Sequence, residues 1–185
     1  MTINHDRYTI FPGRFQPFHN GHDEVVQNFL RRYPDQLLCL AIVFSLSLTK
    51  NSIDIYDRRS ADHLLPERNP FTAWQRLFII QQYIKRQQTA QLMVTLLPQP
   101  SRLYSWPTIE NMFNGKRTWV IPVCGEEWDE QKALFFSEMG DDILRVPSDS
   151  KVNGFVIRTA LANRDFEIAK QSVPAVIWKS IEALQ

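Results

Sequence analysis

The chain has 185 residues, with 21 lysines and arginines against 20 aspartates and glutamates, so its formal net charge is +1. This length fits one domain with a sizeable core, and we treat residues 1–185 as one unit. The balanced charge predicts no basic face for nucleic acid. No apolar run reaches the roughly 20 residues of a membrane span, so we expect no membrane partner.

The N-terminus and the cysteines indicate a compartment. Residues 1–7 are polar and charged, which is not typical of a secretory signal peptide. Cys39 and Cys124 lie far apart in the sequence, and two such cysteines are more typical of reduced thiols than of a disulfide. We therefore expect a cytoplasmic location.

A first strand over residues 8–11 opens the chain and a helix follows it. The helix is predicted from Val25, Val26 and Phe29, which share one helix face, and it ends near Tyr33 because a proline comes next. Residues 37–44 form a continuous apolar run, as in a strand buried on both faces of a parallel sheet.

The rest of the chain continues this alternation. Further strands are predicted over 92–97, 118–123 and 143–146, with helices from residue 69, around 133–139 and at the C-terminus, where Pro174 starts the last one. Strands alternating with helices indicate an α/β fold with a parallel sheet.

Residues 13–22, GRFQPFHNGH, form the turn between the first strand and the first helix. A helix N-terminus favours an anion, and Gly13 and Gly21 let the backbone approach a ligand closely. Arg14, His19 and His22 add side-chain donors. This pattern predicts a site that holds a polyphosphate and stabilises charge that moves during a reaction.

The ten residues resemble the GRFQPxHxGH form of the HxGH signature of nucleotidyltransferases, in particular of archaeal-type nicotinamide mononucleotide (NMN) adenylyltransferases. The resemblance implies a single Rossmann-like domain that transfers AMP from ATP to NMN by direct in-line displacement, giving NAD and pyrophosphate. It implies catalytic roles for His19, His22, Arg14 and Arg158. It also places Gly13, Phe15 and Gly21 against ATP.

Residues 69–76, NPFTAWQR, are similar to the family's NPFTxGER wording, with Trp74 and Gln75 in place of Gly and Glu. The match implies that Arg68, just before it, reaches the ATP phosphates and that Phe71 belongs to the substrate site. The polar stretch before it is longer than an ordinary loop. We interpret part of 47–66 as an insertion, either a lid or a contact surface.

Two further positions follow from the resemblance. Trp106 occupies the place of a tryptophan that stacks on the nicotinamide ring in the family, although a core aromatic is an equally good interpretation. Gly125 resembles the family's strand end beside the nucleotide. Both lie at predicted carboxyl ends of strands, where ligands of such sheets bind.

Residues 151–158, KVNGFVIR, partly match the family's ISxTxIR signature. Arg158 is kept, and Gly154 is compatible with it. Asn153 replaces Ser, and Phe155 replaces Thr, so a hydroxyl that would donate to phosphate is absent. The match assigns Asn153 and Gly154 to ATP binding, with weaker phosphate contacts.

Mg²⁺ is the implied cofactor, carried mainly by the ATP phosphates and water, so no dedicated protein metal site is expected. Three functions remain open: an NMN adenylyltransferase, a sibling adenylyl- or cytidylyltransferase acting on another phosphorylated acceptor, and a catalytically degenerate nucleotide-binding regulatory module. The oligomeric state is also open, and a homo-oligomer is one of the states allowed.

Overall fold

The computed structural model describes residues 7–44, 69–100, 102, 105–123, 127–150 and 152–184. Arg68, Cys124, Gly125 and the expected insertion over 47–66 lie outside the described residues.

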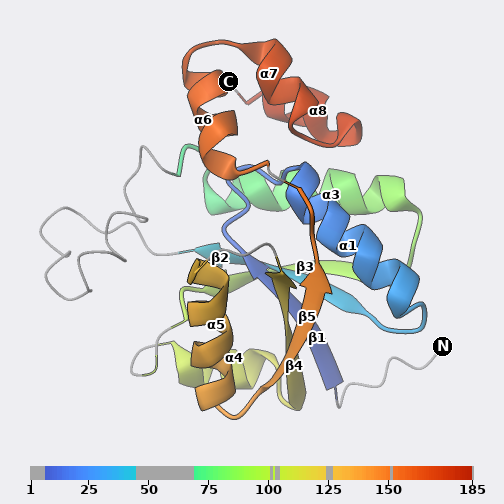
Figure 1. Ribbon diagram of the computed structural model, residues 1–185, viewed down its shortest axis with the longest axis vertical. Coiled ribbons are helices and arrows are strands. Elements are labelled where there is room, and N and C mark those ends of the chain that lie inside the picture. The colour runs from blue at the N-terminus through green and yellow to red at the C-terminus, as the bar shows by residue number, and fades with distance from the viewer. Residues whose placement is uncertain are drawn as a thin grey trace, which may run out of the picture.

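A five-stranded parallel sheet forms the centre of the molecule, with strand order β3-β2-β1-β4-β5 (Figure 1). The strands are β1 (Arg7–Gly13), β2 (Leu38–Phe44), β3 (Leu92–Pro98), β4 (Lys116–Val123) and β5 (Asp142–Pro147). The α/β fold predicted from the sequence is confirmed. The order reverses between β1 and β4, and their carboxyl ends therefore flank the place where such sheets bind ligands.

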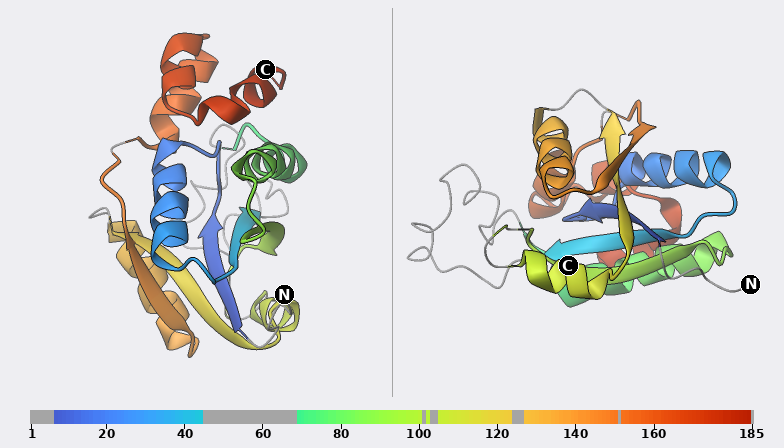
Figure 2. Two further views of the ribbon diagram at one scale, coloured as in Figure 1. Left: turned by 90° about the vertical axis from the view of Figure 1, so that its right-hand side faces the viewer. Right: turned by 90° about the horizontal axis from the view of Figure 1, so that it is seen from below.

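Helices cover both faces of the sheet (Figures 1 and 2). On one side are α1 (Asn20–Arg32), α3 (Ala73–Gln87) and the C-terminal helices α6 (Gly154–Ala162), α7 (Phe166–Gln171) and α8 (Ala175–Glu182). On the other are α4 (Trp106–Met112) and α5 (Glu127–Glu138). Each side has its own apolar core, one around Phe29 and Tyr83 and one around Trp119 and Phe136.

The helix ends follow local capping chemistry. The first helix has His19 as its N-cap and ends at Tyr33, as predicted. The helix predicted from residue 69 is α3, and it begins at Ala73. The Thr72 side chain accepts from the Gln75 backbone N–H and fixes the N-cap there. Pro174 caps α8 as expected.

The C-terminal helices are tied to the turn after β1. The backbone N–H of Asn20 donates to the Ser172 carbonyl at 3.0 Å, and its side-chain amide donates to the Gln171 carbonyl at 2.8 Å. These bonds hold the end of α7 against the start of α1. Cys39 is a buried free thiol. None of the helices in the described part of the chain has the length and apolar character needed to cross a membrane.

Candidate active site

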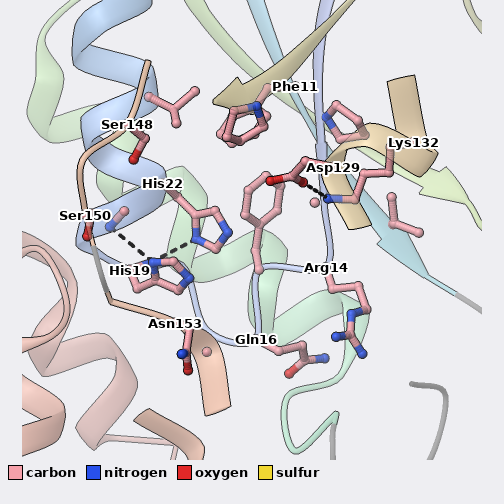
Figure 3. Close-up of a pocket in the computed structure, with 18 of the residues that line it drawn as sticks. Phe11, Arg14, Gln16, His19, His22, Asp129, Lys132, Ser148, Ser150 and Asn153 are labelled. Carbon is pink, nitrogen blue, oxygen red and sulfur yellow. Dashed lines mark hydrogen bonds and ion pairs between the residues drawn. The ribbon is translucent and has the colours of Figure 1, made fainter. Parts of the chain in front are cut away.

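A cavity of about 1140 Å³ opens at the carboxyl ends of β1 and β4 (Figure 3). This volume slightly exceeds the roughly 300–1,000 Å³ that is typical of small-molecule sites. Its walls are the turn after β1, the segment from β5 into α6, and one face of α5. Among the residues lining it are Gly13, Arg14, Phe15, His19, Gly21, His22, Asn153, Gly154 and Arg158, all assigned to the site from sequence.

The two histidines are held by the backbone at the start of α1. His19 Nδ1 accepts from the Gly21 backbone N–H, and His22 Nδ1 accepts from the His19 backbone N–H, both at 3.2 Å. A neutral imidazole whose Nδ1 accepts a hydrogen bond carries its proton on Nε2. Each ring therefore keeps an Nε2–H that can donate to a ligand.

Burial keeps both rings neutral. The pKa of His19 is lowered to about 4, first by burial and then by the charge of Arg158. The pKa of His22 is lowered well below its usual value by burial, by His19 and by Lys132. At neutral pH the cavity thus offers two uncharged imidazole donors, with the positive charge supplied by its arginines and lysine.

Phe15 fixes the position of His22 from behind. Its ring meets the His22 ring edge to face, with centroids 4.8 Å apart, and it is fully packed between Phe11 and Phe18. A Cβ on Gly13 would lie 2.6 Å from the Phe15 ring, so only glycine fits there. Phe15 itself has a φ of 49°, a strained backbone conformation for this residue type.

A buried guanidinium holds the same turn to the neighbouring elements. Arg76, on α3 and only 5% exposed, donates to the carbonyls of Arg14, Val43 and Thr72. Burial and the charge of Arg14 lower the pKa of Arg76 to about 10, so it stays protonated at neutral pH. It therefore joins the turn, the end of β2 and the start of α3.

The start of α6 faces the histidines. Asn153 caps the helix, and its side-chain oxygen accepts from the backbone N–H groups of Phe155 and Val156, both at 3.1 Å. Those two donors are thus already used. Arg158 donates to the Gln16 carbonyl at 3.0 Å, and a Cβ on Gly154 would lie 2.7 Å from its guanidinium. Glycine at this position lets Arg158 lie over the helix start.

Glu24 shapes the wall between β5 and α6. Its carboxylate accepts from the Ser148 hydroxyl and from the backbone N–H groups of Asp149 and Ser150, at 2.9 to 3.1 Å. These bonds lower the pKa of Glu24, the Asp149 bond most. A carboxylate on α1 therefore holds the segment that leads to Asn153.

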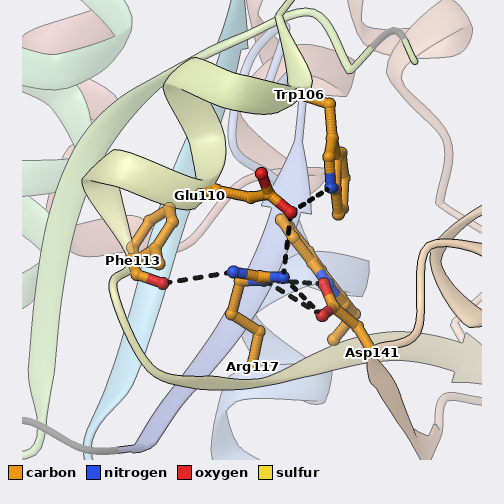
Figure 4. A network of polar contacts seen from close by, with 6 residues as sticks. Trp106, Glu110, Phe113, Arg117 and Asp141 are labelled. Carbon is orange, nitrogen blue, oxygen red and sulfur yellow. Dashed lines mark hydrogen bonds and ion pairs between the residues drawn. The ribbon is translucent and has the colours of Figure 1, made fainter.

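Trp106 belongs to the core and does not line the cavity, which corrects the stacking role considered from sequence. Its side chain is 4% exposed, packs against Trp119 and Phe136, and donates from Nε1 to Glu110 (Figure 4). The Arg117 guanidinium lies over its ring, 5.5 Å from the centroid. This packing depends on α5 and β4, which the local sequence around Trp106 does not reveal.

Phe71 is also a buried residue, and its expected contact with substrate is corrected in the same way. Its backbone N–H donates to Gln16 Oε1, and its carbonyl accepts from Gln16 Nε2. The NPFT segment therefore supports the turn through Gln16 instead of lining the cavity.

Sequence reasoning missed several residues around the cavity: Gln16, Glu24, Arg76, Asp129 and Lys132. Gln16 lies inside the GRFQPFHNGH motif, and Arg76 is the last residue of the NPFTAWQR motif, so a local sequence pattern pointed to both. Asp129 and Lys132 had none, because their place depends on how α5 packs.

Fold and cavity together define a Rossmann-like α/β domain with an HxGH turn at the carboxyl edge of its sheet. No protein-family model matches the chain. A stretch of 76 residues, 41% of the chain, is 34% identical to the nicotinamide-nucleotide adenylyltransferase of Sulfurisphaera tokodaii. A stretch of 73 residues is 33% identical to nicotinamide-nucleotide adenylyltransferase 1 of Sulfolobus acidocaldarius. The matched parts cover 34% and 31% of these relatives, so the chain spans about a third of their length.

Solved structures resemble the whole fold. The bifunctional NMN adenylyltransferase/ADP ribose pyrophosphatase of Francisella tularensis matches 91% of the chain with a TM-score of 0.60 and 18% identity, over 44% of its own length. Thermotoga maritima TmcAL, bound with alpha-thio ATP, matches 96% of the chain with a TM-score of 0.58 and 10% identity, over 55% of its own length. Both likenesses support the Rossmann-like α/β fold of the chain.

Proposed function

We propose that this protein is a nucleotidyltransferase that transfers AMP from ATP to NMN and releases pyrophosphate. The observation that carries the proposal is the pair of neutral histidines whose Nε2–H groups share one cavity with Arg14 and Arg158. The similarity of part of the chain to nicotinamide-nucleotide adenylyltransferases supports the choice of reaction.

The chemistry needs little from the protein beyond positioning and charge. The acceptor phosphate is already an anion, so its oxygen attacks the α-phosphorus of ATP without a general base, and pyrophosphate leaves from the opposite side. His19 and His22 donate hydrogen bonds to the phosphoryl oxygens as charge moves to the leaving group. Arg14 and Arg158 bind the phosphates that leave.

ATP enters as its Mg²⁺ complex. Within the described residues there is no group of three or more histidine, cysteine, aspartate or glutamate side chains placed to hold a metal ion. Mg²⁺ keeps much of its water and binds readily through substrate phosphates, so the proposal assigns the metal to the nucleotide.

A sibling enzyme acting on another phosphorylated acceptor is the second candidate. The burial of Trp106 favours it, because the ring expected to stack on nicotinamide is committed to the core. The phosphate chemistry is the same for both candidates.

The test is a panel of phosphorylated acceptors incubated with MgATP and the purified protein. We expect pyrophosphate release with NMN. Pyrophosphate release with a different acceptor and not with NMN would indicate the sibling enzyme. ATP binding without pyrophosphate release for any acceptor would indicate a nucleotide-binding module.

A further inference from the structure

The wall of the cavity formed by α5 carries an ion pair that the reaction described above does not use. Lys132 Nζ lies 2.7 Å from Asp129 Oδ1, and the two side chains are 31% and 8% exposed. Both residues line the cavity, and Figure 3 shows them facing it across from His22. The ion pair directs the Lys132 ammonium toward the buried carboxylate.

The charged groups stand in an order along the cavity. Figure 3 shows His19 on the side of Asn153, the N-cap of α6, and His22 on the side of Asp129 and Lys132. The two imidazole rings stack between these two walls, with centroids 3.7 Å apart. Arg158 lies over the start of α6, so the cavity has a cation on its α6 wall, the two neutral donors in the middle, and Lys132 on its α5 wall.

An in-line displacement needs this kind of arrangement. The attacking and leaving oxygens lie on opposite sides of the transferred phosphorus, and both carry negative charge. If the histidines bind the transferred phosphoryl group and Arg158 binds the leaving pyrophosphate, the attacking phosphate lies at the other end of the row.

We propose that Lys132, oriented by Asp129, binds the phosphate of the incoming acceptor. The inference rests on the proposed nucleotidyl transfer. An oxygen of the acceptor phosphate forms the new bond to the α-phosphorus, the bond from that phosphorus to the bridging oxygen breaks, and pyrophosphate leaves. Lys132 keeps its proton throughout and acts only through its charge and its N–H donors.

Steady-state kinetics with MgATP and NMN test the assignment. Lys132→Ala should raise the KM for NMN by about 10- to 150-fold, the range expected for a lost charge-assisted hydrogen bond, while the Kd for MgATP changes by less than about twofold. Lys132→Arg should recover part of the loss, and Asp129→Asn should raise the same KM to a smaller extent. Lys116→Ala is the matched control, because Lys116 pairs with Asp142 at 2.9 Å on an exposed surface at the start of β4. Equal losses for NMN and ATP, or no change for NMN, would overturn the assignment.

A second arm separates this inference from the proposed function and from misfolding. The double variant Asp129→Asn/Lys132→Gln removes both charges and leaves no buried carboxylate unpaired. Calorimetry measures orthophosphate binding to protein saturated with a non-hydrolysable ATP analogue and Mg²⁺. Wild type should bind orthophosphate, and the double variant should lose at least about tenfold in affinity. Equal orthophosphate binding by both proteins, or none by wild type, overturns the role of Lys132. If wild type binds orthophosphate in this way but does not turn over NMN, the result counts against NMN as the acceptor and not against Lys132.

Discussion

His19 and His22 form one unit: their rings stack with centroids 3.7 Å apart, and the backbone N–H of His19 donates to Nδ1 of His22. The same Nδ1 atoms that fix the tautomers also cap the first helix. The residues proposed to act on phosphate therefore also start α1, and a test of function must keep the cap.

The variant His22→Asn meets this condition. Asparagine oxygen can accept the His19 N–H as Nδ1 does, but the side chain carries no donor at the Nε2 position. We expect turnover to fall at least about 100-fold, as for a lost transition-state donor, with the melting temperature nearly unchanged. Pyrophosphate release and thermal unfolding measure the two effects. Wild-type turnover in a folded His22→Asn protein would remove the catalytic role of this residue.

Acid should destabilise the fold through the same histidines. The pKa of His19 is lowered to about 4 from 6.5 in the unfolded chain, and that of His22 is lowered too. Between the folded and unfolded pKa values the unfolded chain binds more protons than the folded protein does. The free energy of unfolding therefore falls as pH drops from about 6.5 to 4. His19 alone accounts for on the order of 3 kcal/mol. Denaturant unfolding at stepped pH should show a flatter profile for His19→Asn, and parallel profiles would refute this origin.

Arg76 is predicted to stabilise the turn that carries the site. Arg76→Met leaves the buried carbonyl of Val43 and the part-buried carbonyl of Arg14 without this donor, at about 1–3 kcal/mol each. We expect a loss of about 2–5 kcal/mol in the free energy of unfolding. Arg86→Met, at an exposed position on the same helix, should change it by less than about 0.5 kcal/mol. Similar losses in both variants would show that Arg76 has no special role.

Arg158 should dominate the binding of the ATP phosphates from α6. Asn153 already occupies the N–H groups of Phe155 and Val156, and Phe155 supplies no hydroxyl. A lost charge-assisted bond is worth roughly 1.5–3 kcal/mol, so Arg158→Ala should weaken MgATP binding by about 10- to 150-fold in calorimetry. The control is Arg164→Ala, an exposed arginine just after α6. An unchanged Kd for Arg158→Ala would place the phosphates elsewhere.

Trp106 is predicted to be structural. Trp106→Ala should lower the free energy of unfolding by about 3–5 kcal/mol, as for other truncations of buried aromatics. The milder Trp106→Phe should fold and bind NMN as wild type does. A selective loss of NMN affinity in folded Trp106→Phe would restore the stacking role.

Local patterns predicted most of the fold and the centre of the site. The apolar run at 37–44 is a strand buried on both sides of the sheet, and the HxGH turn is contiguous in sequence, so its histidines needed no tertiary information. The predicted start of α3 was wrong, because Pro70 suggested an earlier start than the Thr72 cap allows.

The errors and omissions are tertiary in origin. Trp106 is buried because β4 and α5 bring Trp119 and Phe136 against it, and no spacing within its own loop shows this. Lys132 faces the cavity for the same reason, through the packing of α5 on the sheet. Residues that complete a site from a distant element are the ones that the sequence alone does not identify.

The most direct measurement follows the α-phosphorus of ATP. Wild type is incubated with ATP labelled at the α-phosphate, Mg²⁺ and NMN, and the label is located by chromatography and on the denatured protein. Direct displacement predicts that the label moves into NAD, that an equal amount of pyrophosphate forms, and that none stays on the protein, while His22→Asn transfers at most about one hundredth as fast. Label retained in ATP, or attached covalently to the protein, would contradict the proposed reaction.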